Sequence, residues 1–130
     1  MTAPLYRLYT ILNSEAVKDM KGNRGRMVTQ GAHGYLHAFW DAEARFPEDA
    51  RAYRTQASAF KITLVAGSEA ELRAIAERYR DLCGVAVTEE KGTRTDGTVN
   101  VEVRGVTGIG IGPLRDDLVG EDIRALRPFL

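Results

Sequence analysis

The stretch FKITLVAGSEAELRAIAERYRDLCG (residues 60–84) joins a β-rich segment to an amphipathic helix, and this pairing indicates the α/β class. Residues 60–65 are rich in β-branched and aromatic side chains, which favour a strand. Ser68 offers a side-chain cap, and Glu71 three residues later completes a capping box. The 3.6-residue period of a helix then appears in the apolar positions Leu72, Ile75, Ala76, Tyr79, Leu82 and Cys83. Gly84 is expected to end this helix as its C′ residue.

The N-terminal side of this stretch repeats the alternation of strand and helix. Residues 5–12 (LYRLYTIL) form a nearly continuous apolar run, which predicts a strand covered on both faces. Residues 14–25 are polar and glycine-containing, so a loop is expected there. Residues 26–45 carry apolar and small side chains at spacings of three and four, which predicts one long helix that Pro47 stops or kinks. A further helical piece is expected over residues 48–57.

The C-terminal side predicts the rest of the sheet. Residues 85–88 are a candidate short strand, and Asp96-Gly97 predicts a turn into a strand that continues to Ile111. Such a turn implies an antiparallel neighbour and therefore a mixed sheet. A last helix is expected over residues 116–126, with Leu118, Ile123 and Leu126 inward. Together these elements predict a three-layer α/β/α single domain spanning residues 1–130, with a small mixed β-sheet. The side chains expected to pack on its two faces are Met27, Tyr35, Phe39, Ile62, Leu64, Leu72, Ile75 and Tyr79.

The charge of the chain bounds its partners. Its 130 residues include 18 basic and 18 acidic side chains, so the formal net charge is zero. A general binder of polyanions is therefore excluded, and any nucleic-acid site is local. The densest positive cluster is Lys18, Lys21, Arg24 and Arg26, interrupted by Asp19. The alternative interpretation of this cluster is a solvated loop and helix start.

Several kinds of site and location are not expected. The chain shows no signal peptide and no run of about 18 apolar residues, so a cytoplasmic protein is predicted. Cys83 is the single cysteine and is expected to be a small buried hydrophobe. His33 and His37 lie four apart but have no evident third ligand, so no metal is expected. The glycines between 108 and 112 lead into Pro113 rather than a helix, so no nucleotide cofactor is expected.

Residues 19–34 read DMKGNRGRMVTQGAHG, which resembles the type II peptidyl-tRNA hydrolase family pattern DLxMxxGKxAAQxxHA. The two align without a gap, and Arg26 stands at the lysine of the family while Gly22 replaces its methionine. The identical positions are Asp19, Gly25, Gln30 and His33. Residues 107–113 (TGIGIGP) are similar to the family's TVLxIGP, residues 61–64 resemble its second strand, and the helix after Ser68 falls where its third helix is expected.

The chain departs from the family pattern at three points. Arg26 keeps the positive charge of the lysine, but a permanently protonated guanidinium orients or stabilises rather than shuttles a proton. The family's DAGxTQ segment has no clean counterpart: counting back from Thr107 reaches Asp96, and counting forward from Gly84 reaches Glu90. The third departure is the neutral net charge, because a basic balance is expected of an enzyme that acts on tRNA.

The resemblance implies hydrolysis of the ester between a peptide and the 3′ end of tRNA, by a homodimer that needs no cofactor. Such a reaction requires an oriented water, a group that stabilises the tetrahedral oxyanion, and a cationic surface for phosphates. We assign oxyanion or phosphate stabilisation to Arg26 and orientation of the water to an acid, Asp96 before Glu90. Thr107 is a candidate to hydrogen-bond the reacting centre, and His33 is a candidate general base.

Substrate binding is assigned to Gln30, Lys18, Lys21 and Arg24, of which the three cations would clamp the acceptor stem. Each role has a structural alternative: Thr107 as a sheet hydroxyl, His33 as a hydrogen-bonded helix residue, and Gln30 as a packing residue. For the whole chain, one alternative is a non-catalytic binding or regulatory module with the same fold. Another is a hydrolase of small esters or amides that does not use tRNA, which the zero net charge favours.

Overall fold

The computed structural model describes residues 4–20, 23–96 and 99–129, apart from the side chains of residue 19 and residues 90–104. Its core is a five-stranded mixed sheet in the order β3-β4-β1-β2-β5. The strands are β1 (Tyr6–Asn13), β2 (Lys61–Ala66), β3 (Val85–Asp96), β4 (Val99–Arg115) and β5 (Arg127–Pro128). Strands β1 and β2 pair in parallel and the other neighbours pair antiparallel. The predicted mixed sheet is confirmed.

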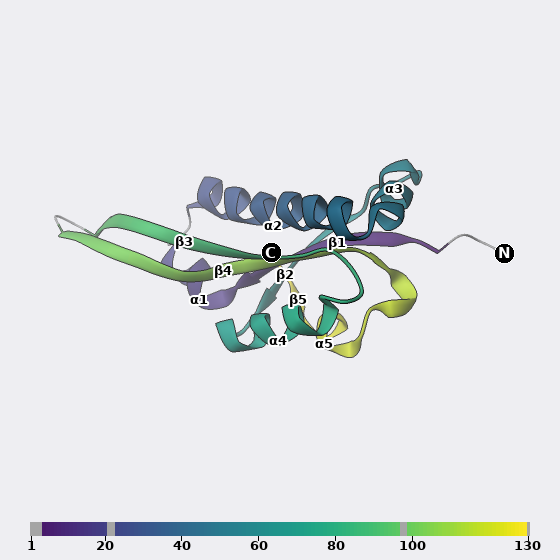
Figure 1. Cartoon of the computed structure of the whole chain (residues 1–130). Coiled ribbons are helices and arrows are strands. Elements are labelled where there is room, and N and C mark those ends of the chain that lie inside the picture. Colours follow the sequence, from purple (N-terminus) through teal and green to yellow (C-terminus); the bar gives the residue numbers. More distant parts are fainter. Residues whose placement is uncertain (1–3, 21–22, 97–98, 130) are drawn as a thin grey trace.

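The helices cover both faces of this sheet. They are α1 (Ser14–Asp19), α2 (Arg24–Arg45), α3 (Pro47–Thr55), α4 (Glu69–Tyr79) and α5 (Glu121–Arg124), with a short 3-10 helix η1 (Asp116–Leu118). Figure 1 shows α2 and α3 over one face and α4 and α5 over the other, which confirms the predicted three-layer arrangement. Among the described residues, no helix combines the length and the apolar character needed to cross a membrane.

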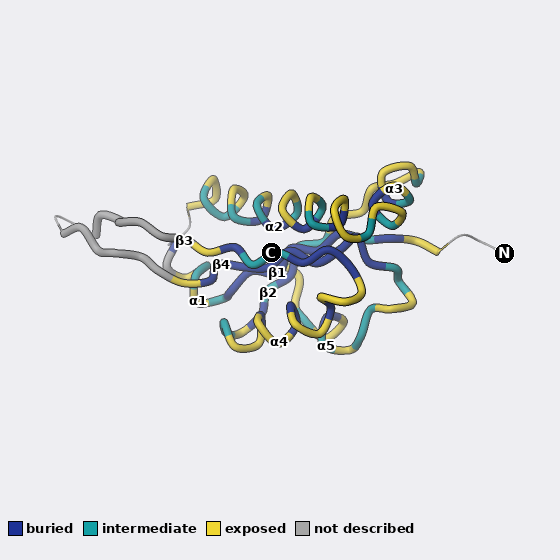
Figure 2. Tube along the Cα trace, viewed as in Figure 1, coloured by how far each residue is buried: buried dark blue, intermediate teal, exposed yellow. Residues whose placement is uncertain are grey.

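Two clusters of buried side chains hold the layers together. Figure 2 shows that the buried residues concentrate along the central strands. The larger cluster lies between the sheet and the α4 layer and includes Ile11, Leu64, Leu72, Ile75, Tyr79, Ile109 and Ile123. The smaller cluster lies under α2 and α3 and is made of Tyr6, Leu8, Ala38 and Tyr53, with Tyr35 and Phe39 packed against it. The residues predicted to face the sheet from α2 and α4 therefore lie on its two faces, with Met27 half-buried in the same α2 layer.

Helix α2 packs unusually close to β4 because its inner face carries small residues. Its buried positions are Gly31, Gly34, Ala38 and Ala42. A Cβ atom on Gly110 of β4 would overlap the carbonyl group of Gly34, so the two backbones are in direct contact. The hydroxyl of Thr10 in β1 also donates to the carbonyl oxygen of Gly31 at 2.7 Å. This close approach brings side chains at the edge of the helix within reach of the strands.

The predicted Ser68 cap of α4 is confirmed, but Glu71 Oε2 accepts from the Gly67 amide instead of the Ser68 amide, and the predicted end of the helix is wrong. Ser68 caps the helix, since its Oγ accepts a hydrogen bond from the Glu71 amide at 3.2 Å. Helix α4 ends at Tyr79, so the prediction that Gly84 is its C′ residue is wrong. Gly84 is required for a different reason: a Cβ there would meet the carbonyl oxygens of Ala38 and Gly112. Packing of α2 against the sheet, and not helix termination, explains this glycine.

Three other expectations are corrected. Residues 14–19 form α1 instead of a loop, because the Asn13 side chain accepts from the Glu15 amide and caps a helix. Strand β3 is 12 residues long instead of four, since its charged part pairs with β4 in a long hairpin. The predicted helix 116–126 is divided into η1 and α5, and Leu118 is exposed whereas Ile123 is buried. Residues 127–128 form β5, which the sequence did not indicate.

A carboxylate in α2 joins the helix to the α4–β3 connection. Asp41 Oδ2 accepts from the Val85 amide at 2.9 Å and from Arg45 Nη2 at 2.6 Å. Arg45 also donates to the carbonyl oxygens of Arg80 and Cys83, at 2.7 and 2.9 Å. The hydrogen bond that Asp41 accepts from Arg45, and after it the one from the Val85 amide, hold the pKa of Asp41 below its ordinary value. Asp41 therefore stabilises the fold in its charged form.

We expect Asp41→Ala to lower the free energy of unfolding by about 1–3 kcal/mol, the usual effect of losing charged hydrogen bonds. The folded pKa is depressed, so this contribution is present above the unfolded pKa and is lost as the pH falls through the folded value. In urea unfolding, the difference in free energy of unfolding between wild type and variant should be constant near neutral pH. It should become smaller below roughly pH 4. Glu43→Ala is the control, because the contact that Glu43 makes within the described part of the chain is a long one, 3.7 Å to Arg54. An equal loss of unfolding free energy in Glu43→Ala would contradict the role of Asp41. A difference between wild type and Asp41→Ala that is as large at pH 2 as at neutral pH would contradict it as well.

Candidate functional site

Thr107 lies at an irregularity of the sheet that turns its side chain toward α2. The β3–β4 register passes from Thr88 opposite Gly108 to Glu89 opposite Val106, which leaves Thr107 as an extra residue of β4. A bulge of this kind re-aims a side chain and is frequent beside functional sites. The Thr107 hydroxyl is buried and lies 2.7 Å from Gln30 Oε1, with the Thr88 carbonyl oxygen at 3.3 Å. The bulge therefore connects the sheet to α2 through a hydroxyl.

Gln30 is the residue of α2 that receives this contact. Its side-chain oxygen accepts the hydrogen bond from Thr107, which fixes the orientation of the amide plane. The other half of the amide is an NH₂ group, which only donates. Gln30 is half-buried, so this donor lies at the border between the packed layer and solvent. The arrangement is suited to binding a carbonyl or phosphate oxygen.

Arg26 and His33 lie on the same face of α2, about one turn to either side of Gln30. Residues at spacings of four and three are neighbours on a helix surface. Asn23 caps the helix, since its Oδ1 accepts from the Arg26 amide at 3.0 Å, and so fixes the first turn. Both Arg26 and His33 are half-buried, and the His33 ring faces the His37 ring. The structure therefore aligns three predicted site residues, with Thr107 in contact with the central one.

The two candidate acids occupy different places along β3. Asp96 is the last residue of β3, eight residues beyond Thr88, or roughly 26 Å along an extended strand. Glu90 is two residues beyond Thr88, or roughly 7 Å, and its backbone pairs with Gly105. The side chains of both acids are outside the described residues. The structure does not bring Asp96 beside Thr107, and the shorter separation favours Glu90, so the identity of the acid stays a prediction.

The described residues of the basic cluster lie on two different helices. Arg24 is exposed at the start of α2, and Lys18 is exposed in the last turn of α1. Figure 1 shows α1 below the sheet and α2 above it, at the same end of the molecule. Lys21 lies outside the described residues. Arg24 and Lys18 thus flank the end of the sheet at which β1 terminates, and their surroundings are solvent-accessible.

Thr88 is a further residue of this neighbourhood, and sequence reasoning missed it. Its side chain is buried, and within the described part of the chain its Oγ1 has no hydrogen-bond partner. A buried hydroxyl without a partner costs about 1–3 kcal/mol, so such groups call for an explanation. Its carbonyl oxygen lies 3.3 Å from the Thr107 hydroxyl. Only the strand register places Thr88 here, and no sequence signal would have indicated it.

Cys83 has no part in the site. It is fully buried in the core on the α4 side, as predicted, and burial raises the pKa of its thiol to about 12. The thiol therefore stays protonated near neutral pH and is a poor nucleophile. Its place in the structure is that of a small hydrophobic residue.

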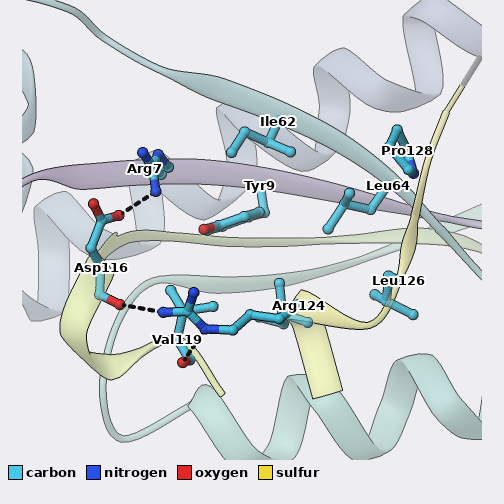
Figure 3. A pocket seen from close by; sticks show the side chains of 10 residues that line it. Arg7, Tyr9, Ile62, Leu64, Asp116, Val119, Arg124, Leu126 and Pro128 are labelled. Atoms are coloured by element: carbon cyan, nitrogen blue, oxygen red, sulfur yellow. Dashed lines mark hydrogen bonds and ion pairs between the residues drawn. The ribbon is translucent and has the colours of Figure 1, made fainter. Parts of the chain in front are cut away.

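A cavity of about 390 Å³ lies on the opposite side of the sheet, between β1, β2 and the C-terminal segment (Figure 3). Arg7 forms an ion pair with Asp116 at 2.8 Å, and Arg124 donates to the carbonyl oxygens of Asp116 and Val119. Burial raises the pKa of Tyr9, whose ring forms part of the wall. The guanidinium groups hold the C-terminal segment in place, and no predicted site residue lines this cavity. The α2 face remains the candidate site.

Comparison with known proteins gives one clear result. A family model described as peptidyl-tRNA hydrolase PTH2 matches residues 9–129. The matched range runs from β1 to β5 and includes α2, the bulge at Thr107 and the β3–β4 hairpin. Among curated proteins, no sequence matches the chain significantly.

Proposed function

The chain belongs to the peptidyl-tRNA hydrolase PTH2 family, and we propose that the α2 face around Gln30 is where it hydrolyses the ester of peptidyl-tRNA. Peptidyl-tRNA hydrolysis is the activity of this family. The observation that carries the location is the 2.7 Å hydrogen bond between Thr107 and Gln30, which holds a donor amide between Arg26 and His33. The family match supports neither the non-catalytic module nor the small-ester hydrolase.

The reaction begins when a water oxygen attacks the carbonyl carbon of the ester. A tetrahedral oxyanion forms, and donors aimed at it lower the barrier because its charge develops only in the transition state. In our proposal the Gln30 amide and the Arg26 guanidinium supply these donors. The bond between the carbonyl carbon and the ribose oxygen then breaks, and the ribose oxygen takes up a proton. Arg26 remains charged throughout, so it stabilises the oxyanion without exchanging a proton.

The proton of the attacking water needs an acceptor. We propose an acid of β3 for this role and place Glu90 before Asp96, because Glu90 lies closer to Thr88 along the strand. His33 is the second candidate, since an imidazole nitrogen is able to accept a proton. Thr107 is a positioning residue in this scheme: it fixes the Gln30 amide and does not itself react. The Thr88 carbonyl oxygen lies 3.3 Å from the Thr107 hydroxyl and helps to hold it in place.

We propose that Arg24, Lys18 and Lys21 bind the phosphates of the substrate. Contacts of this kind position the RNA without reading its sequence, which suits an enzyme that accepts many tRNAs. They also give a neutral protein a local attraction for a polyanion. We further propose that residues 1–130 work as one domain, in the cytoplasm and as a homodimer. These last points rest on the family resemblance and on the sequence.

The direct test of the activity is release of free tRNA from N-acetylated aminoacyl-tRNA by the purified chain. We expect release proportional to enzyme concentration, and no comparable hydrolysis of an N-acetylated amino-acid ethyl ester. Gln30→Leu is the variant to compare with the wild type, because leucine nearly keeps the size of the side chain and removes the amide. Hydrolysis of the ethyl ester alone would support the small-substrate alternative. Absence of both reactions in a folded protein would support the binding module.

Binding of tRNA should weaken steeply with salt, because each neutralised phosphate releases counterions. The expected slope of log affinity against log salt is about −0.9 per phosphate contact on a duplex. Arg24→Ala should make this slope shallower by about one unit and weaken binding equally for different tRNAs. Filter binding or anisotropy between about 50 and 200 mM salt measures it.

The control for this experiment is Arg51→Ala, which removes an exposed arginine from α3, at the other end of the sheet from the start of α2. We expect its slope to equal that of the wild type. An affinity that does not respond to salt, or an equal change in both variants, would contradict the proposed phosphate surface.

A further inference from the structure

Three aromatic rings continue the line of site residues along α2. The His33 and His37 rings stack with centroids 5.5 Å apart and planes inclined by 28°, and the His37 and Trp40 rings stack at 5.5 Å and 23°. With Arg26 and Gln30 they form one stripe, at successive spacings of four, three, four and three residues. We call the three rings the ring ladder. It begins next to Gln30 and ends at Trp40, whose side chain is 54% exposed.

We infer that the ring ladder is a stacking platform for the unpaired nucleotides at the 3′ end of the tRNA. This inference rests on the proposed function, because it names the part of the substrate that lies beside the reacting ester. Every base has an aromatic face, so successive bases stack on protein rings without sequence readout. One face of the Trp40 indole stacks on His37, and its exposure leaves room for a base on the other face.

The charge of this helix segment favours a polyanion over an acidic partner. Residues 24–40 contain no Asp or Glu, although the chain has 18 acidic residues. The segment includes Arg24, Arg26 and the two histidines of the ladder. Acidic side chains resume directly after it, at Asp41, Glu43, Glu48 and Asp49. The helix segment that carries the ladder therefore contributes no acidic side chain, and the same segment carries Gln30 and Arg26.

The length of the ladder also fits a short single strand. From His33 to Trp40 the helix rises by roughly 10 Å. A strand that runs along α2 from a base on the free face of Trp40 covers this distance in about three nucleotide steps of about 3.4 Å each. The 3′ ester is the last atom group of the tRNA chain, and the ladder begins one turn from Gln30. A strand that stacks on the ladder thus ends where the donors of Gln30 and Arg26 are placed.

Trp40 is the single tryptophan of the chain, so its fluorescence reports on the ladder alone. We expect the trinucleotide CCA to quench this emission in a saturable way in the wild-type protein. His37→Ala, which removes the middle ring, should weaken CCA binding by about tenfold, the scale of one lost stacking contact. Leu118→Ala is the control, because it removes an exposed apolar side chain from η1. This binding experiment does not depend on hydrolysis.

The hydrolysis assay gives a second readout. Trp40→Ala should raise KM for N-acetylated aminoacyl-tRNA by about tenfold and leave kcat unchanged, and Trp40→Phe should restore most of the affinity. Absence of saturable quenching by CCA, together with an unchanged KM in Trp40→Ala, would overturn the inference while hydrolysis by the wild type stands. A change in oligomeric state in Trp40→Ala, without any effect of CCA, would instead identify the ladder as a protein interface. Quenching without hydrolysis would overturn the proposed function alone.

Discussion

Arg26→Ala should fold almost normally and lose about 10²-fold or more of the hydrolytic turnover. The side chain projects from the first turn of α2, where the backbone is already fixed by the Asn23 cap, so alanine removes no structural hydrogen bond of the main chain. If the guanidinium stabilises the oxyanion, its loss acts on the transition state and therefore lowers kcat more than it raises KM. Single-turnover kinetics on N-acetylated aminoacyl-tRNA, with thermal melting to verify folding, measure the effect.

Arg26→Lys then distinguishes two ways in which the charge is used. Restoration or increase of turnover by lysine would show that the site needs a point charge. Failure of lysine would show that a bidentate guanidinium contact is required. An alanine variant with unchanged turnover would show that Arg26 is a solvated residue of the helix start. The proposed oxyanion site would then lose its charged member.

Gly110→Ala adds one methyl group, and among such additions in the sheet it should lower the free energy of unfolding most. The added Cβ would overlap the Gly34 carbonyl group and press on Ala38, so α2 would have to move away from β4. Overpacking usually costs about 1–3 kcal/mol, and a clash between two backbones lies at or above the upper end of that range. Since α2 carries Gln30 and β4 carries Thr107, displacement of the helix should also abolish turnover. Urea unfolding and the hydrolysis assay measure the two effects.

Gly67→Ala is the matched control, because its Cβ would meet only a glutamate oxygen at an ordinary distance of 3.5 Å. We expect it to change stability by less than about 1 kcal/mol. A Gly110→Ala variant as stable as this control would mean that α2 does not lie against β4 as described. Loss of stability without loss of turnover would mean that the distance between helix and strand does not matter for catalysis.

The sequence predicted the elements whose signals are local. The Ser68 cap and the helical period from Leu72 to Tyr79 were sufficient for α4 except for its end, and the apolar run of residues 5–12 was sufficient for β1. The errors arose where tertiary contacts decide. Gly84 resembled a helix terminator but is required by close packing against Ala38 and Gly112. The charged continuation of β3 resembled a loop because its strand character depends on pairing with β4.

The candidate site shows the same difference between local sequence signals and features that tertiary contacts decide. The resemblance to the family selected Arg26, Gln30 and His33, and the structure places these three residues on one face of α2. The contact between Gln30 and Thr107 was not predictable, because it depends on a bulge that shifts the register by one residue. The acid was also beyond sequence reasoning, since two counts along an insertion gave Glu90 and Asp96. The register now separates these two by their distance from Thr88.

The central claim is that the Thr107 hydroxyl positions Gln30 for hydrolysis, and Thr107→Val tests it most directly because valine keeps the shape and removes the hydroxyl. The loss of one positioning hydrogen bond, about 1.4 kcal/mol, corresponds to roughly a tenfold decrease in kcat. Thr107→Ser keeps the hydroxyl and should retain most of the turnover. The measurement is kcat for release of tRNA from N-acetylated aminoacyl-tRNA by the three proteins, with folding verified by thermal melting. We predict that valine loses activity and serine retains it, whereas equal turnover in Thr107→Val and the wild type would contradict the site described for this protein.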